Sequence, residues 1–467
     1  MGRVIVLEFN ELTPSLVERF MQAGRLPGFS KLFSESHTFI SDAEERAPNL
    51  EPWIQWVTVH TGLAFEEHGV FELGDGHKLN SPRVWDLASD AGRKVWVCGS
   101  MNAGRRGPVK GYILPDPWSV GIEPYPAKEF DDYFKFVSYY VQEYTRHEVR
   151  LSRADQLRFV RFMAGRGLSL RTVGAIVRQL ASERGGHNRW KRATILDRLQ
   201  WDLFAWYYRE SQPDFATFFL NSTAHFQHVY WRNMDPEPFV QKPAPDDQAE
   251  HGDAVLYGYQ QMDRIIQDCL ALAGADTTVM LCTALSQQPC LNYEGTGGKK
   301  WYRMIEPDAL LRFAGVTESY RYAPVMSEQF RLYFHSGAAA ADAGRRLAGL
   351  SIRDKPAMYT KLEGAEVFAG CSVITEQPED AVLTSRSNGA SARFHDMFYL
   401  VDVTKSGMHH PDGIWWIRTL QRTHREHGRV SLRQVAPTIL SVLGVPQPDS
   451  MKPPPVPALD PLLSHQA

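Results

Sequence analysis

The sequence has little cysteine, little net charge and no long apolar run. Its five cysteines among 467 residues are odd in number and form no CxxC pair, which argues against a disulfide framework and favours a reducing compartment. No apolar stretch approaches the roughly 18 residues of a membrane-spanning helix, and the N-terminal apolar run is too short for a signal peptide. The formal net charge of -3 argues against a general nucleic-acid binder. These absences predict a soluble, cytoplasmic protein that does not bind nucleic acid.

The sequence does contain abundant material for a large core. Hydrophobic residues make up 43% of the chain and aromatic residues 12%. An apolar run of strand length at residues 3–9 is followed by helical spacing at residues 13–24, in which Thr13 would cap the helix and Gly24 would end it. The same alternation recurs along the chain, and fully apolar strands between helices are typical of a parallel sheet covered on both faces. The sequence therefore predicts an α/β/α sandwich with functional groups at the carboxyl ends of the strands.

Two segments interrupt this alternation, and we interpret both as insertions that form a cap over the core. Residues 126–195 are helical in pattern, aromatic and rich in arginine, whereas residues 292–392 mix short strand-like runs with glycine. The alternation is expected to resume with HDMFYLVDV at residues 395–403. The core would then comprise three stretches followed by a proline-rich tail: residues 1–125, 196–291 and 393–450, with the tail at 451–467.

The first insertion concentrates positive charge. Between Arg146 and Arg192 the sequence has eleven arginines and one lysine against three acidic residues. Because the guanidinium group binds phosphate in a bidentate manner, Arg146 and Arg150 are candidates for binding an anionic substrate. The alternative is that these arginines lie on the solvated faces of amphipathic helices. The aromatic and basic run at residues 130–151 leaves a third interpretation open, peripheral contact with an anionic membrane surface.

Four blocks of the sequence occur in the order in which one enzyme superfamily carries them. VLEFNELTPSLVERF, from residue 6, resembles an opening strand with its metal-bearing turn, and NLEPWIQWVTVHTG, from residue 49, resembles a nucleophile helix. FFLNSTAHFQHVYW, from residue 218, and SGMHHPDGIWWI, from residue 406, are similar to two blocks that supply metal ligands. On these blocks the chain resembles the alkaline phosphatase superfamily, in particular its type I phosphodiesterase and nucleotide pyrophosphatase branch. The resemblance implies the α/β/α fold of that superfamily, with the two insertions outside it.

The resemblance also implies a chemistry, because that superfamily cleaves phosphoesters with two metal ions, Asp and His ligands at strand ends, and a Thr or Ser nucleophile. At most of the matching positions this chain has a residue that cannot play the expected role. Asn10 and Ala224 stand where the superfamily has Asp ligands, and Ala284 and Leu285 stand where it has an Asp-His pair. Glu51 or Pro52 stands at the position of the nucleophile. His228 and His409 survive, and both match ligands of the same metal ion. The resemblance thus implies a divergent member that holds at most one metal ion.

Three histidines are the candidate ligands for that ion. His225 lies beside the position of the missing Asp, and together with His228 and His409 it could hold a single zinc ion with an open fourth position. His410 is an alternative to His409. The competing interpretation is that His225 and His228 are structural polar residues in a turn.

Three acidic residues complete the candidate site. Glu51 begins the helix that should carry the nucleophile, so it could serve as general base or covalent nucleophile, or simply as a first-turn carboxylate favoured by the helix dipole. Glu8 and Asn10 share one face of the first strand, which makes Glu8 a second catalytic candidate and Asn10 a candidate for substrate binding. Glu11 begins the turn that follows. Either Glu8 or Glu11 is expected to be a cleft residue or a partner of one.

Two classes of function follow from these features. The first is a hydrolase or transferase that acts on a phosphoester or another anionic small molecule, including a glycan or lipid phosphate, with an altered site and at most one zinc ion. The second is a non-catalytic descendant that keeps the fold as a binding or scaffold protein. Fold alone does not separate them.

Overall fold

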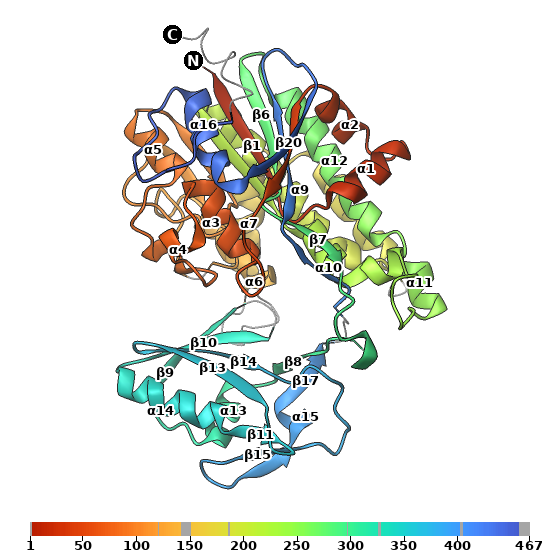
Figure 1. Ribbon diagram of the computed structural model, residues 1–467, viewed down its shortest axis with the longest axis vertical. Helices are drawn as coiled ribbons and strands as arrows, with labels where there is room; N and C mark the ends of the chain where they lie inside the picture. The colour runs from red at the N-terminus through yellow and green to blue at the C-terminus, as the bar shows by residue number, and fades with distance from the viewer. Residues whose placement is uncertain are drawn as a thin grey trace.

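The structure is a computed structural model, and it describes residues 2–119, 121–141, 151–184, 187–296, 298–325, 328–401 and 405–456. Its main feature is an eight-stranded sheet in the upper lobe of the molecule (Figure 1). From one edge to the other the strands are β20 (Arg425–Ser431), β2 (His37–Asp42), β19 (Asp412–Arg418), β6 (Thr277–Cys282), β1 (Arg3–Phe9), β5 (Phe215–Leu220), β3 (Val95–Cys98) and β4 (Gly111–Leu114).

The sheet is mostly parallel, as predicted. The central strand β1 pairs in parallel with β5 on one side and β6 on the other. Only β19 runs against both of its neighbours, β6 and β2, among the strands of this sheet. Because parallel strands end at the same edge, the segments after β1, β5 and β6 meet at one rim, and Figure 1 shows β1 running down toward the lower lobe.

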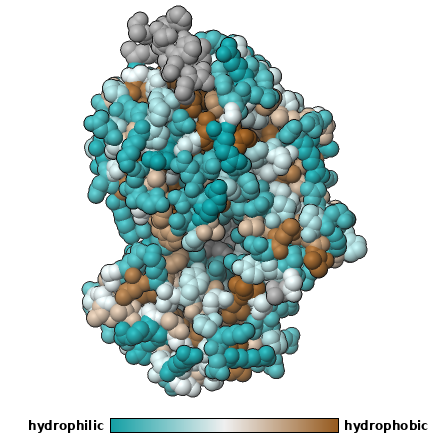
Figure 2. Space-filling model, viewed as in Figure 1, coloured by the Kyte–Doolittle hydropathy of each residue, from teal (hydrophilic) through white to brown (hydrophobic). Residues whose placement is uncertain are grey.

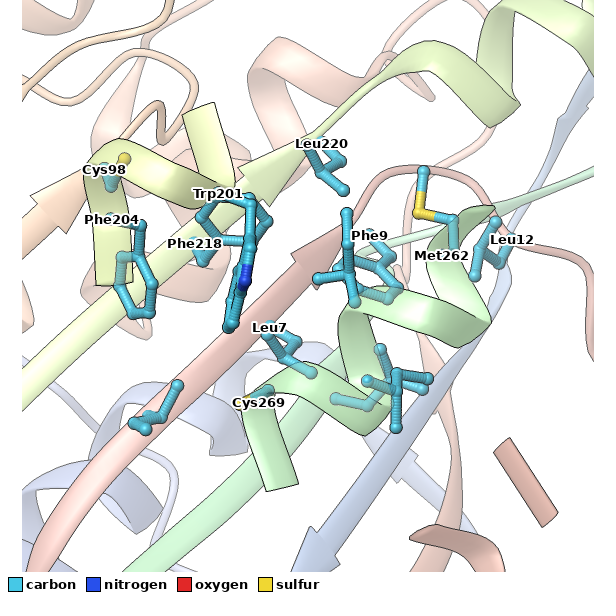
Figure 3. Close-up of a cluster of buried hydrophobic side chains, with 14 of the residues drawn as sticks. Leu7, Phe9, Leu12, Cys98, Trp201, Phe204, Phe218, Leu220, Met262 and Cys269 are labelled. Carbon is cyan, nitrogen blue, oxygen red and sulfur yellow. The ribbon is translucent and has the colours of Figure 1, made fainter. Parts of the chain in front are cut away.

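Helices cover both faces of the sheet, which confirms the α/β/α sandwich. The first face carries α1 (Pro14–Gln22), α2 (Pro27–Ser34), α9 (Ala193–Ser211) and α12 (Ala254–Leu272). The second face carries α3 (Pro52–Thr61), α5 (Val84–Asp90) and α16 (Val435–Leu443). Successive residues of β1 alternate between these two cores, with Leu7 and Phe9 in the first and Val6 in the second. Figure 3 shows Leu7 and Phe9 beside Phe218 of β5 and Trp201 of α9.

The arginine-rich segment is helical, as its pattern predicts. It forms α6 (Asp131–Val141), α7 (Arg153–Ala164) and α8 (Leu170–Ser182). Tyr133, Phe159 and Phe162 of these helices are buried in the first core, so the segment packs onto that helix layer. Arg146 and Arg150, the two arginines predicted to bind substrate, lie outside the described residues.

A second lobe with its own core lies below the sandwich (Figure 1). One four-stranded sheet contains, in order, β13 (Met358–Glu363), β14 (Glu366–Cys371), β10 (Gln329–Phe334) and β9 (Tyr320–Pro324). A second four-stranded sheet contains β12 (Lys355–Pro356), β11 (Leu350–Ile352), β15 (Val382–Ser385) and β16 (Ser391–Arg393). The remaining two strands, β17 (Phe398–Val401) and β8 (Trp301–Met304), form a pair. The helices of this lobe are α13 (Pro307–Ala314), α14 (Gly337–Ala348) and α15 (Phe394–Met397).

The strand in HDMFYLVDV differs from its prediction. We expected it to return to the central sheet, but β17 pairs with β8, and Phe398 is buried in the core of the second lobe. A short apolar run has the same pattern in either sheet, so its partner depends on packing that the pattern does not specify.

A buried arginine joins the two lobes. Arg331 of β10 forms ion pairs with Glu72 at 3.6 Å and Asp75 at 3.4 Å, both from the upper lobe, and also pairs with Glu366 of its own lobe. Burial raises the pKa of Glu72 to about 7, against the opposing effects of Arg331 and Lys361. Figure 2 shows a molecule that narrows between the lobes and has a mostly hydrophilic surface on this side, with hydrophobic residues in scattered patches.

All five cysteines are free and buried. Over the described ranges, none of the helices combines the length and the apolar composition that crossing a bilayer requires.

Candidate active site

The first turn after β1 brings an acidic residue to the strand-end rim. Glu11 has a φ of 62°, a left-handed conformation that is uncommon for residues other than glycine. Its backbone N–H donates to the carbonyl of Thr283, just beyond β6, at 3.2 Å. The Glu11 side chain is only 2% exposed. An unusual backbone conformation at a buried acid is the kind of local strain that concentrates at functional sites.

Two histidines from distant segments converge on this carboxylate. Oε2 of Glu11 lies 3.0 Å from Nε2 of His228 and 3.4 Å from Nε2 of His409. His228 comes from α10 (Ser222–Met234), and His409 comes from β18 (Gly407–His410), which pairs with β7 (Ser286–Pro289). One ligand atom from each of the three residues lies within 4.8 Å of the other two. We call Glu11, His228 and His409 the strand-end cluster.

Hydrogen bonds orient both imidazole rings toward the centre of the cluster. Nδ1 of His228 lies 3.0 Å from the carbonyl oxygen of Gly407, and Nδ1 of His409 lies 2.9 Å from that of Leu50. A carbonyl oxygen only accepts, so each Nδ1 carries a proton and each Nε2 is available for a ligand when the ring is neutral. Metal-binding histidines are commonly held by such a bond from the other ring nitrogen.

The carboxylate of Glu11 is held as firmly as the rings. Oε1 accepts a bond from Asn10 Nδ2 at 2.7 Å, and Oε2 accepts one from Gln287 Nε2 at 2.6 Å. Gln227 Nε2 donates to the backbone oxygen of Glu11 at 2.7 Å. Asn10, a predicted substrate-binding residue, also donates to Asn221 at 2.8 Å and accepts from the Trp56 indole at 2.8 Å. Its amide is therefore fully engaged in positioning Glu11 within the rim.

The charges of the cluster shift the pKa of each member. Burial alone would raise the pKa of Glu11, but the charges and hydrogen bonds of His409 and His228 outweigh it and hold that pKa well below its usual value. Burial lowers the pKa of His228 more than Glu11 raises it. For His409 the negative charges of Glu11 and Glu51 outweigh burial, and its pKa is raised. Without a metal, an anionic carboxylate is thus paired with the His409 ring.

Glu51 lies at the edge of the cluster. It precedes α3 at the N-cap position, and its side chain makes no capping hydrogen bond. Instead Oε2 lies 3.4 Å from Nδ1 of His409, with 30% of the side chain exposed. Burial raises the pKa of Glu51, while the charges of His409, Lys405 and Lys299 act in the opposite direction. Two lysines thus lie close enough to Glu51 for their charges to act on it.

The remaining predicted residues occupy different environments. Glu8, a predicted catalytic acid, is 1% exposed and pairs with His60 Nε2 at 2.9 Å and Ser100 Oγ at 2.6 Å. His225 is exposed on α10 and lies outside the strand-end cluster, in which Glu11 is the third candidate ligand. His410 Nδ1 accepts from the backbone of Asp412 at 3.2 Å. His228 and His409 are therefore the two predicted ligands that the structure brings together.

Apolar groups occupy the rim after β6. Ala284 and Leu285, at the positions matched to an Asp-His pair, are both 0% exposed and belong to the second core. Ala284 has a φ of 58°, so the chain keeps a left-handed turn here without a polar side chain. Thr58, the first hydroxyl of the nucleophile helix, is buried and lies 3.3 Å from Nε2 of His68. Neither the turn after β6 nor Thr58 offers a ligand or a nucleophile to the cluster.

The comparisons with known proteins identify the family. The fold is an α/β/α sandwich, and its strand-end cluster is a candidate metal centre. The family model for type I phosphodiesterase / nucleotide pyrophosphatase matches residues 4–312, and the chain belongs to this family, part of the alkaline phosphatase superfamily. A search of curated proteins found no match.

Three solved structures are similar to the chain over nearly its whole length. Murine ectonucleotide pyrophosphatase / phosphodiesterase 5 shares 9% identity, with 96% of each chain covered and a TM-score of 0.42. Phosphonoacetate hydrolase from Sinorhizobium meliloti 1021, in complex with phosphonoformate, shares 12%, with 95% of this chain and 96% of that one covered and a TM-score of 0.42. The wild-type alkaline phosphatase PafA shares 12%, with 98% of each chain covered and a TM-score of 0.47. At this level of similarity they carry no information about the ligands of the present chain.

Sequence reasoning identified the histidines of the cluster but not the role of Glu11. The sequence placed Glu11 at the start of the turn, as a cleft residue or a partner of one, without linking it to His228 and His409. Gln287 was missed, because the polar run SQQP has no strand-like pattern, yet it forms β7 and pairs with the strand of His409. One signal for Glu11 was available in the sequence. Glu11 is an acidic residue directly after Asn10, and Asn10 stands where the resemblance implies an Asp ligand.

Proposed function

We propose that this protein is a hydrolase or transferase for phosphoesters that uses one divalent metal ion, held by Glu11, His228 and His409. The observation that carries the proposal is the convergence of these three ligand atoms within 4.8 Å of one another. Glu11, in the turn after β1, supplies the carboxylate that Ala224 of α10 does not, so a set of two imidazoles and one carboxylate is complete. Such a set is one that zinc accepts in catalytic sites.

The donors fit a metal ion in their orientation as well as their type. Both Nε2 atoms face Oε2 of Glu11, and each ring is fixed through Nδ1. A bound zinc ion would polarise a phosphoryl oxygen and lower the pKa of a water molecule. Glu51 lies beside His409 with its carboxylate partly exposed, where it can accept a proton from an attacking water or hydroxyl. The hydrogen bond between His409 Nδ1 and the carbonyl oxygen of Leu50 fixes the start of α3 and thereby holds Glu51 at the rim.

The charges around the cluster favour an anionic substrate. Lys299 and Lys405 both act electrostatically on Glu51, and neither forms an ion pair among the residues that the structure describes. Lysine binds phosphate as a point charge. The family of this chain acts on phosphodiesters and nucleotide pyrophosphates by name, so a phosphodiester is the substrate class that the rim suits best.

A second candidate function rests on the apolar rim after β6. Ala284 and Leu285 carry no ligand atom, so a second metal ion of the kind that the superfamily uses would lack these two donors. A descendant that binds a phosphorylated ligand without cleaving it would keep the same cluster and lysines. The two functions differ in a single respect, whether a bound phosphodiester turns over.

An aryl phosphodiester assay with and without added zinc separates them. We expect slow zinc-dependent hydrolysis, and we expect Glu51→Gln to reduce kcat by about 100-fold, the lower end of the effect of a general base. The matched control is Glu66→Gln, an exposed acid on the nearby helix α4 (Phe65–His68), which should be unaffected. Full activity in the Glu51 variant would refute its role, and zinc binding without any turnover would favour the binding function.

A further inference from the structure

A cavity lined by arginines lies between helices α8, α9 and α12, apart from the strand-end cluster. Its volume is about 490 Å³, within the range of small-molecule sites, and no member of the cluster lines it. Four arginines from three helices face it: Arg171 from α8, Arg198 and Arg209 from α9, and Arg264 from α12. The proposed reaction uses none of these residues.

Two of the arginines converge without an acidic partner. Arg198 Nη2 and Arg264 Nη1 both donate to the same atom, Oε1 of Gln261, the latter at 3.2 Å. Two guanidinium groups within hydrogen-bond distance of one oxygen lie close to each other, and like charges repel. Within the described chain neither Arg198, Arg264 nor Arg209 forms an ion pair, so most of their N–H donors remain available to a ligand.

The acidic residues of the cavity do little to neutralise these arginines. Asp268 is paired with Arg171 at 3.0 Å, and Asp202 accepts the backbone N–H of Ser169 at 2.8 Å. Asp197 accepts the hydroxyl of Ser222, and burial raises its pKa to about 7. Burial and then the charge of Arg264 lower the pKa of Arg198, as expected for a cation with too little negative charge nearby.

We infer that this cavity binds a small molecule through a phosphate group, held between Arg198 and Arg264. Guanidinium groups present paired N–H donors that match the oxygens of phosphate, and two of them suit a dianion. Trp201 of α9 and Ile265 of α12 also line the cavity and add apolar atoms that the organic part of such a ligand can contact. The site is separate from the strand-end cluster, and the inference does not depend on the proposed reaction.

Calorimetric titration of the full chain in chelator tests the inference, with inorganic phosphate and phenyl phosphate as probes. We expect saturable binding of one equivalent, weakened about tenfold or more in Arg264→Gln and in Arg198→Gln, because each loses a charge-assisted hydrogen bond. Arg178→Gln, an exposed position on α8 outside the cavity, is the matched control. Tighter binding of phenyl phosphate would identify an organic phosphate as the ligand, and equal binding would identify inorganic phosphate.

Three results would overturn the inference. They are no saturable binding by the wild type, equal affinity in Arg264→Gln, and loss of binding in His228→Ala, which would place the phosphate at the strand-end cluster instead. Arg264 is exposed, so its variant is expected to fold even if the partly buried Arg198 variant does not. Circular dichroism of each variant verifies this.

Discussion

Replacing Glu11 by glutamine removes the only anionic donor of the strand-end cluster while keeping the size of the side chain. The amide keeps one acceptor oxygen, so it retains only one of the hydrogen bonds from Asn10 and Gln287, and it no longer attracts a divalent ion beside His228 and His409. Loss of a residue that merely orients a ligand costs 10- to 100-fold in metal affinity. For a ligand itself we therefore expect a loss of about 100-fold at least, or about 2.7 kcal/mol.

The loss can be measured as zinc-dependent stability, because a ligand that binds only the folded state stabilises it in proportion to its affinity. At a zinc concentration 100 times the Kd, the wild type gains about 2.7 kcal/mol. A variant that binds 100-fold more weakly gains only about 0.4 kcal/mol at that concentration. Any change in the stability of the metal-free protein cancels, because each protein is compared with itself in chelator.

The assay is denaturant unfolding of wild type, Glu11→Gln and the exposed control Glu66→Gln, each with zinc and with chelator. The control should match the wild type, since Glu66 lies on the surface of α4. Equal zinc-dependent stabilisation of the wild type and Glu11→Gln would refute the reasoning, because it would show that zinc binds somewhere else.

Two further predictions concern the fold. The pKa of Glu72 is about 7 in the folded chain, above its usual 4.5. Between these two pKa values the folded state retains a proton that the unfolded state loses. The stability of the fold therefore falls as pH rises from about 5 to about 7, by on the order of 3 kcal/mol. Glu72→Gln should remove this slope in urea unfolding at pH 5 and pH 8, and an unchanged slope would contradict it. At Gly28 of α2, a Cβ would lie 2.5 Å from the backbone oxygen of Asp263 in α12, so Gly28→Ala should cost on the order of 1–3 kcal/mol. Gly107→Ala, with open space around it, should be neutral in the same measurement, and equal stability of the two variants would refute the packing argument.

The fold was predictable because its central strands are apolar on both faces. Every residue of β5 and β6 is buried and most are apolar, and α12, the helix directly before β6, has clear helical spacing. The pairing of β17 with β8 was not predictable, because short apolar runs in the second lobe look the same as runs of the central sheet. Local pattern therefore identifies elements, whereas partners depend on tertiary packing.

The site was predictable only where a residue stands at a position that matches a ligand of the superfamily. His228 and His409 follow from two blocks of the resemblance, but Glu11 reaches them through a left-handed turn that no periodicity reveals. The polar strand β7 lacks an apolar alternation, so Gln287 had no signal either. Conformations set by a few turn residues are thus the part of a site that sequence patterns describe least.

The central claim is that Glu11, His228 and His409 together hold one metal ion. Elemental analysis of the full chain, purified without added metal and then equilibrated with zinc and desalted, tests it directly. We expect one zinc ion per chain in the wild type and in the control His335→Ala, which changes an exposed histidine of the second lobe, and none in His228→Ala or His409→Ala. Zero or two ions per chain in the wild type, or one ion retained in both cluster variants, would contradict it.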